Sequence, residues 1–187
     1  MYEDYPFWFT FFTALGFRVI ISEKSTRKTY EKGMESMPSE SVCYPAKLVH
    51  GHIVDLMERG IDTIFYPCMT YSRKEYKGAD NNYNCPIVIS YPEVIRNNVE
   101  SLNKVNFINA FLPFDISKLA KRILETNEFS KYNFSKDELI AAGRKAEEEH
   151  KKVKEDLQRV GEETIEYINK NKMKGIVLAR KTLPCRP

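Results

Sequence analysis

Short apolar runs alternate with helical patterns along the chain, and this alternation most constrains the fold. Segments 17–22, 62–66 and 105–111 are rich in β-branched and aromatic residues, which is typical of buried strands. A short strand is also predicted at 87–90 and a final one at 175–179. Strands separated by helices usually run parallel in one sheet that is covered on both faces. The sequence therefore predicts a three-layer, mainly parallel, Rossmann-like α/β fold.

Helical signals fill the intervals between these strands. The last helix begins at a capping box formed by Ser135 and Glu138, and its apolar residues repeat at helical spacing from Leu139 to Ile168. It is expected to be a long C-terminal helix with a solvated, mixed-charge face. Helices are predicted over 5–15, 25–33, 45–60, 92–99, 116–125 and from 135 to about 172.

Composition and charge exclude several classes of partner. A chain of 187 residues fits one domain, and its net charge is +3. Arg180, Lys181 and Arg186 account for this whole excess, and no basic stripe interleaves with aromatics, so nucleic acid is not an expected partner. The apolar run 6–21 contains Arg18 and is too short and polar to span a membrane, and no basic region of a signal peptide precedes it. A cytoplasmic location is expected.

Three cysteines lie beside predicted element ends. Cys43 precedes the helix that starts near Pro45, and a helix N-terminus favours negative charge. Cys68 follows a strand, and functional groups gather at the carboxyl ends of parallel strands. Cys85 precedes the strand predicted at 87–90, so it reaches the same place only if the loop that starts at Met69 folds back.

From the residues alone, the role of these thiols stays open. Four cysteines in this chain do not indicate a disulfide framework, and there is no C-x-x-C pair. Thiolates suit an iron–sulfur cluster or zinc, and ordinary buried thiols are the third alternative. A zinc site would take the three cysteines plus His50 or His52. These two histidines make a poor chelating pair, because residues two apart on a helix point in different directions.

The residues around Cys43 supply supporting candidates, namely Ser41, Lys47 and His50. Glu40 and Lys47 bracket Cys43 and could hydrogen-bond a bound acyl group or a cluster sulfur, with plain surface placement as the alternative. The chain has no phosphate-binding glycine loop, serine elbow or H-E-x-x-H helix. It is therefore not expected to hydrolyse ATP by itself, and as an isolated piece of a larger protein it should have no turnover.

Four segments of the chain carry a resemblance to a known family. They are MYEDYPFW at 1–8, PSESVCYPAKLVHGH at 38–52, FYPC at 65–68 and DNNYNCP at 80–86. They resemble the uncharacterised domain of CoA-substrate-specific enzyme activases, which are large proteins of anaerobic bacteria related to 2-hydroxyacyl-CoA dehydratases and their activators. The resemblance covers roughly residues 1–179, and the segment around Cys43 is its most specific part.

This resemblance implies a function for the thiols. Relatives use ATPase modules to pass a low-potential electron to a dehydratase, whose four-iron clusters are each held by three cysteines near the acyl-CoA thioester. By resemblance, Cys43, Cys68 and Cys85 would ligate a [4Fe–4S] cluster, which an aerobic preparation can lose. The expected function is electron transfer or acyl-CoA handling, and the alternative is a docking or scaffold domain with buried, reduced cysteines. The expected partners are an ATPase activator module, a dehydratase-like domain of the parent protein, acyl-CoA and a second copy paired at a sheet edge.

Residues 1–179 are expected to form a single α/β domain cut from a larger multidomain protein, because in the family a strand precedes the first helix. The tail 180–187 departs from the family ending Ala-Gly-Arg-Pro-Tyr-His-Val-Asp-Pro. Inserting one nucleotide into a coding of that ending yields Ala-Arg-Lys-Thr-Leu-Pro-Cys-Arg-Pro, the sequence of residues 179–187. We hypothesise that a frameshift produced the tail, which would make Cys185 an accident.

Resequencing the template tests the frameshift hypothesis. The expected result is one extra nucleotide just after the codon of Ala179. A template that reads through Arg180 in an unshifted frame would contradict it.

Overall fold

The computed structural model describes residues 3–74, 78 and 80–176. By their internal contacts, these residues fall into two compact units. The first unit combines residues 3–19 with 134–176, and the second comprises residues 20–133. Each unit is described by itself below.

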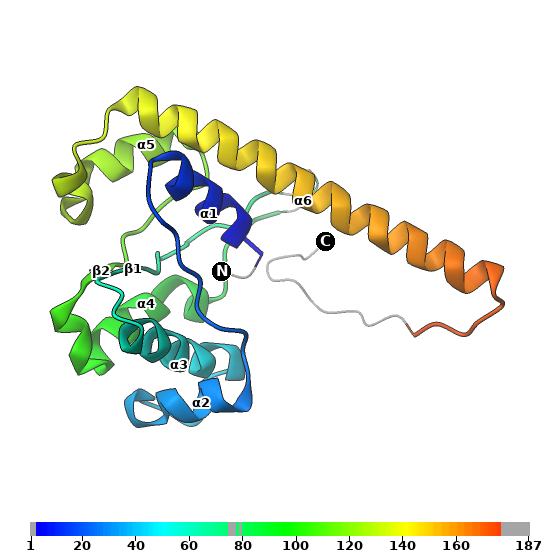
Figure 1. Cartoon of the computed structure of the whole chain (residues 1–187), viewed down its shortest axis with the longest axis horizontal. Coiled ribbons are helices and arrows are strands. Elements are labelled where there is room, and N and C mark those ends of the chain that lie inside the picture. Colours follow the sequence, from blue (N-terminus) through cyan, green and yellow to red (C-terminus); the bar gives the residue numbers. More distant parts are fainter. Residues whose placement is uncertain (1–2, 75–77, 79, 177–187) are drawn as a thin grey trace. The chain divides into compact units, whose positions relative to one another are not determined.

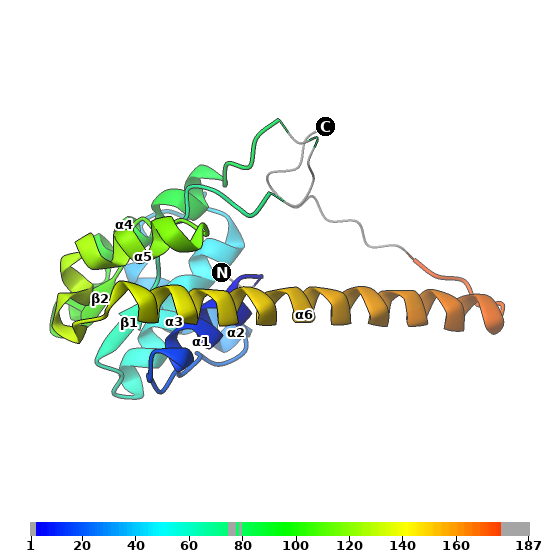
Figure 2. The ribbon, with the colours of Figure 1, turned by 90° about the horizontal axis from the view of Figure 1, so that it is seen from above.

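The first unit is a helix pair. Helix α1 (Tyr5–Ala14) packs along the first half of α6 (Lys136–Lys170), the long yellow-to-orange helix of Figures 1 and 2. Gly16, at φ +87°, ends α1 as predicted, because this left-handed conformation costs glycine little. The buried residues of the two helices are Pro6, Phe7, Trp8 and Phe11 on α1 and Leu139, Ala142, Gly143, Ala146 and His150 on α6.

The predicted capping box of α6 is confirmed. The Ser135 hydroxyl oxygen accepts from the Glu138 backbone N–H at 3.2 Å, and the Glu138 carboxylate accepts from the Ser135 N–H at 2.8 Å. The helix runs for 35 residues, and i,i+4 ion pairs such as Arg159–Glu163 at 3.0 Å lie on its exposed surface. The long C-terminal helix is therefore confirmed.

The second unit is built around a β-α-β crossover. Strand β1 (Thr63–Phe65) pairs in parallel with β2 (Asn106–Ile108), and α4 (Pro86–Asn98) connects them. Helix α3 (Tyr44–Glu58) precedes β1 and packs with α4 against the sheet (Figure 1). The core of this unit comprises Ala46, Ile53, Ile64, Tyr91, Ile95, Val99, Leu102 and Phe107.

Shorter elements complete the second unit. Helix α2 is confirmed at the site of the predicted polar helix, and α5 has the predicted bounds 116–125. The elements are α2 (Arg27–Gly33), η1 (Met34–Ser36), η2 (Glu100–Lys104), α5 (Ile116–Glu125) and η3 (Asn127–Tyr132).

The three-layer Rossmann-like sheet is not confirmed. The described part of the chain is a helix-rich α/β arrangement with a two-stranded parallel sheet and a long C-terminal helix. The strand predicted at 17–22 is wrong, since this segment pairs with no strand in the described residues and the Ile21 carbonyl instead accepts from Arg59 at 3.1 Å. Of the strand predicted at 175–179, residues 177–179 lie outside the described residues, and Gly175 and Ile176 are not in a strand.

The strand predicted at 87–90 is also wrong, because these residues form the first turns of α4. Pro86 occupies a favourable position in the first turn, where no N–H donor is needed. The prediction began the helix at Pro92, but Pro92 lies inside it, where it cannot donate to the carbonyl four residues earlier. Pro92 is fully buried, so its packing offsets part of that loss.

Arginine side chains protect the outer edge of β2. Arg96 donates to the Phe107 carbonyl at 2.7 Å, and Arg122 donates to the Phe111 carbonyl at 3.4 Å. Phe107 lies in β2 and Phe111 three residues beyond its end. The hydrogen bonds toward the β1 side involve the alternate residues 106, 108, 110 and 112, so the carbonyls of Phe107 and Phe111 point away from it. Charged side chains on an exposed strand are a common defence against unwanted pairing.

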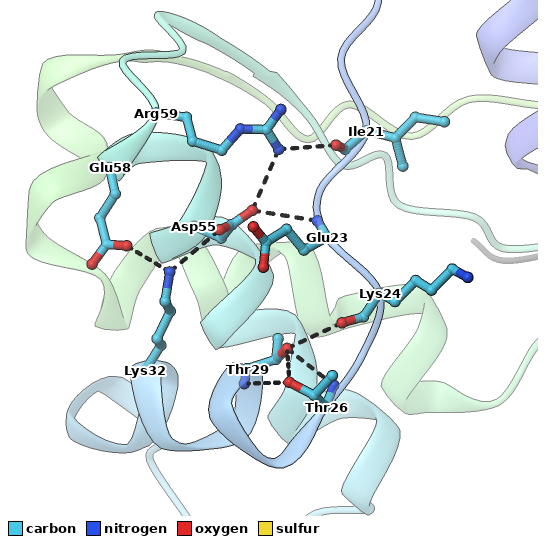
Figure 3. A network of polar contacts seen from close by, with 9 residues as sticks. All are labelled: Ile21, Glu23, Lys24, Thr26, Thr29, Lys32, Asp55, Glu58 and Arg59. Carbon is cyan, nitrogen blue, oxygen red and sulfur yellow. Dashed lines mark hydrogen bonds and ion pairs between the residues drawn. The ribbon is translucent and has the colours of Figure 1, made fainter.

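A buried carboxylate ties α2 and the segment before it to α3 (Figure 3). Asp55 is 4% exposed and accepts from the Glu23 N–H and the Lys32 ammonium, each at 3.3 Å, and Arg59 lies 3.5 Å from it. Burial alone would raise the pKa of Asp55, but these donors outweigh it and hold the pKa below its ordinary value. Lys32 also donates to Glu58 at 2.6 Å.

Two glycines allow α2 and α3 to approach closely. A Cβ atom on Gly51 would overlap the Thr29 carbonyl oxygen, and one on Gly33 would overlap the Gly51 nitrogen. The glycine between the two histidines of the His50-Gly51-His52 sequence is therefore a packing requirement.

Substituting Gly51→Ala should destabilise the protein by about 1–3 kcal/mol or more, because the methyl group forces α2 away from α3. Gly161→Ala is the matched control, since Gly161 lies exposed on α6 with no atom within 4 Å of an added Cβ. That change should stabilise the protein by about 0.5–1 kcal/mol. Urea unfolding midpoints measure both changes, and a Gly51→Ala variant as stable as the starting protein would contradict the close contact.

Candidate functional site

Cys68 lies at the carboxyl end of β1, as predicted. Its N–H donates to the Ala110 carbonyl at 3.0 Å, and its carbonyl accepts from Leu112 at 3.2 Å, so parallel pairing continues past the strands. The side chain is fully buried. Burial, reinforced by the charge of Glu93, raises the pKa of the Cys68 thiol to about 11, although a hydrogen bond with the Glu93 backbone and the charge of Arg96 partly oppose this. The thiol is therefore neutral at pH 7.

Cys85 also lies at the carboxyl end of the sheet, because the loop after Cys68 folds back. The sequence analysis required this fold-back for Cys85 to lie near Cys68. Asn84 donates from its backbone N–H to the Thr70 carbonyl and from its side chain to the Met69 carbonyl, both at 2.9 Å. Met69 and Asn84 are the chain neighbours of Cys68 and Cys85. These bonds therefore hold the two cysteines at one end of the sheet.

The returning loop is a hairpin with aromatic residues on its surface. Tyr71 and Tyr83 form an antiparallel bridge, their rings lie 4.6 Å apart and the Tyr71 hydroxyl donates to that of Tyr83 at 3.0 Å. Next to them, the Ser72 N–H donates to the Asn82 carbonyl at 2.8 Å. The sequence indicated a long loop here but not this internal pairing.

Cys43 and Cys85 begin helices in the same way. Cys43 is the N-cap of α3, with φ −60° and ψ 144°, and Cys85 is the N-cap of α4, with φ −56° and ψ 141°. Each is followed by proline within the first two helical positions, and neither side chain makes a capping hydrogen bond. Both sulfurs therefore stand at helix N-termini, where the helix dipole favours negative charge. The sequence predicted this for Cys43 and missed it for Cys85.

The short connection between α3 and β1 places Cys43 at the same edge. A short connection joins the end of α3 to the start of β1, so α3 runs back along the sheet and its N-terminus lies at the carboxyl end of β1. Burial raises the pKa of Tyr66 most, and electrostatic interactions with Tyr91, Cys68 and Cys43 raise it further. We call the end of the sheet that carries Cys43, Cys68 and Cys85 the cysteine edge.

The cysteine edge is not a compact site for a single metal ion. Among the described residues, no group of three or more His, Cys, Asp or Glu side chains is placed to hold one. This includes the zinc alternative, since neither histidine lies in such a group, and the His50 ring is hydrogen-bonded through both of its nitrogens. The two histidines point to different partners, as predicted.

His50 is a buried structural link between two helices. Its Nδ1 lies 2.8 Å from the Ser36 hydroxyl, and its Nε2 lies 3.0 Å from the Tyr91 hydroxyl on α4. Burial lowers the pKa of His50 to about 4, so the ring is neutral at pH 7. Its nearness to Cys43 in the sequence made His50 a candidate, but local sequence could not reveal its contact with Tyr91, which is 41 residues away.

Lys47 and Ser41 hold the segment that leads into Cys43. The Lys47 ammonium donates to the Glu40 carbonyl at 2.5 Å. The Ser41 hydroxyl lies 2.8 Å from that of Ser39, whose oxygen also accepts from the Ser41 N–H at 3.2 Å. These contacts shape the backbone before Cys43.

Acid should weaken folding through His50. The pKa is about 4 in the folded protein and about 6.5 in the unfolded chain, which therefore binds more protons between these values, so stability is lost as pH falls through this window. From pH 7.5 to 4.5 this loss is about 2.5 kcal/mol. His50→Gln should be less stable at pH 7.5 but should lose correspondingly less on acidification. Urea unfolding at both pH values measures this, and equal losses in the two proteins would contradict it.

Comparisons with known proteins place the chain in a family. The described residues contain no helix long and apolar enough to cross a membrane. No curated protein and no solved structure matches the chain. A protein family described as the CoA enzyme activase uncharacterised domain matches residues 1–182. The chain therefore belongs to the CoA enzyme activase uncharacterised-domain family.

Proposed function

We propose that this domain is the cysteine-bearing module of a larger CoA enzyme activase system and binds a [4Fe–4S] cluster through Cys43, Cys68 and Cys85. The observation that carries the proposal is that three separate elements bring their thiols to one edge of the sheet. Two of these elements are helices with cysteine at the N-cap.

The donor set fits an iron–sulfur cluster better than a single ion. Thiolates are the usual ligands of such clusters, and three of them leave one iron open. Because a four-iron cluster separates its ligands further than one ion does, it suits cysteines that share an edge without forming a compact group. When bound, such a cluster would supply low-potential electron transfer or an open iron for an acyl-CoA group.

The protein supplies the charges that cluster ligation needs. The N-termini of α3 and α4 favour negative charge at Cys43 and Cys85. Cys68 must lose its proton in a buried position, where burial and the charge of Glu93 raise the pKa of its thiol, and a hydrogen bond with the Glu93 backbone and the charge of Arg96 oppose this in part. Arg96 is therefore the charge that supports a Cys68 thiolate.

A docking or scaffold role is the second candidate, and the full burial of Cys68 favours it. A thiol with no exposed surface and a raised pKa behaves as an ordinary apolar core group. In that case the domain would join an ATPase activator module to a dehydratase-like domain, with its cysteines reduced. An acyl-CoA would then bind elsewhere in the system.

Anaerobic reconstitution with iron and sulfide separates the two candidates. Cluster binding predicts uptake near four irons per chain with visible absorbance. A Cys43→Ala, Cys68→Ala, Cys85→Ala triple variant should lose both signals, and Cys185→Ala should keep them. Circular dichroism must show that the triple variant is folded. No uptake by the folded starting protein would overturn the cluster and support the docking role.

A further inference from the structure

Phe111 is the pairing partner of Cys68 beyond the ends of the two strands. The two residues form a parallel bridge, in which the Cys68 N–H donates to the Ala110 carbonyl at 3.0 Å and the Leu112 N–H donates to the Cys68 carbonyl at 3.2 Å. Neighbouring strands lie about 4.8 Å apart, and the side chains of paired residues project to the same face of the sheet. The Phe111 ring is therefore a direct neighbour of the Cys68 thiol.

The face that carries Phe111 and Cys68 is the one that α3 and α4 cover. Ile64 and Phe107 are paired in the strands and lie in the core with residues of these two helices. Cys68 and Phe111 are each four residues farther along the chain and keep the same register. Because side chains alternate between faces, they project to the same side as Ile64 and Phe107. The N-capping cysteines of α3 and α4 begin the helices on that side.

The exposure of the two side chains differs sharply. Cys68 is fully buried, whereas Phe111 is 45% exposed. Leu112, which also bonds to Cys68, is buried and by alternation projects to the opposite face. A half-exposed ring beside a fully buried thiol forms part of the cover between that thiol and the solvent. Iron and sulfide reach Cys68 only if such a cover opens.

The Phe111 backbone is held while its ring is not. On one side the next residue bonds to the Cys68 carbonyl, and on the other side Arg122 donates to the Phe111 carbonyl at 3.4 Å. Among the described residues, no aromatic or cationic group stacks on the Phe111 ring, whereas the Arg73 guanidinium lies 4.2 Å from the centre of the Phe114 ring. A half-exposed side chain on a fixed backbone can turn toward the solvent by a change of rotamer alone.

We infer that Phe111 is a gating residue for Cys68, whose ring closes over the thiol and turns outward to admit a thiol-directed ligand. Phe111 thus acts through Cys68 and is a positioning residue. Its part in cluster assembly rests on the proposed function, of which it is the access step. The cover itself is a property of the metal-free, reduced protein.

Alkylation of the metal-free, reduced full chain with iodoacetamide tests the gate, with the labelling rate of each cysteine followed by mass spectrometry. Phe111→Ala should speed the labelling of Cys68 by about tenfold or more, the gain that a one-unit fall in the thiol pKa would give alone. The rate at the exposed Cys43 should stay the same. Phe111→Leu keeps a large apolar side chain and should preserve slow labelling. Leu124→Ala is the matched control, because Leu124 is 49% exposed on α5 and should not affect Cys68.

A urea series separates an open gate from unfolding. Labelling through an open gate is nearly independent of low urea concentrations, whereas labelling through unfolding rises with them. A Phe111→Ala variant whose Cys68 reacts as slowly as in the starting protein would overturn the gate. So would a gain that rises with urea, or an equal gain in Phe111→Leu or Leu124→Ala. No cluster is needed for these rates, so failed iron uptake and a failed gate remain distinguishable.

Discussion

The hydrogen bond between His50 and Tyr91 joins α3 to α4 inside the core, and the cysteine edge depends on this junction. These two helices begin at Cys43 and Cys85, so their relative placement sets the separation of the two thiols. The close contact at Gly51 fixes α3 from its other side, against α2. An aliphatic residue at position 50 could fill the same space, but it would leave the Tyr91 hydroxyl without this partner.

The two candidate functions place different energetic demands on Cys68. Moving the pKa of its thiol from about 11 to pH 7 corresponds to about 5 kcal/mol, which ligation by a cluster would have to supply. Metal–thiolate bonds routinely provide more than this. A docking domain has no such requirement, since a neutral buried thiol is stable in the core. The burial of Cys68 is therefore a cost for cluster ligation and none for docking, and metal uptake shows whether that cost is met.

Local sequence signals predicted the helices well. The strands were predicted less well, because they depend on contacts between residues far apart in the chain. Capping by Ser135 and the left-handed Gly16 are properties of a few adjacent residues, so the start of α6 and the end of α1 were predictable. Segment 87–90 reads as a strand because β-branched residues dominate it, yet tertiary packing and Pro86 favour a helix. Segment 17–22 has strand composition, but in the described residues it pairs with no strand, and the Ile21 carbonyl accepts from Arg59, which follows α3.

The same limit applies to the candidate site. Cys43 and Cys68 adjoin the ends of elements that the sequence predicted, so their positions could be expected. The approach of Cys85 depends on Asn84 bonding back to Met69 and Thr70, and the burial of His50 depends on Tyr91. Neither contact can be predicted from the local periodicity of the sequence.

The arginines on the outer edge of β2 make the two edges of the small sheet different. If two copies were to pair through their β2 strands, Arg96 and Arg122 of each would have to leave the carbonyls they now bond, and four guanidinium groups would converge on one seam. Arg96 would also lose its place 3.6 Å from Glu128. Symmetric growth through β2 is thus disfavoured by electrostatics as well as by lost hydrogen bonds, which directs any added strand to the opposite side of the sheet.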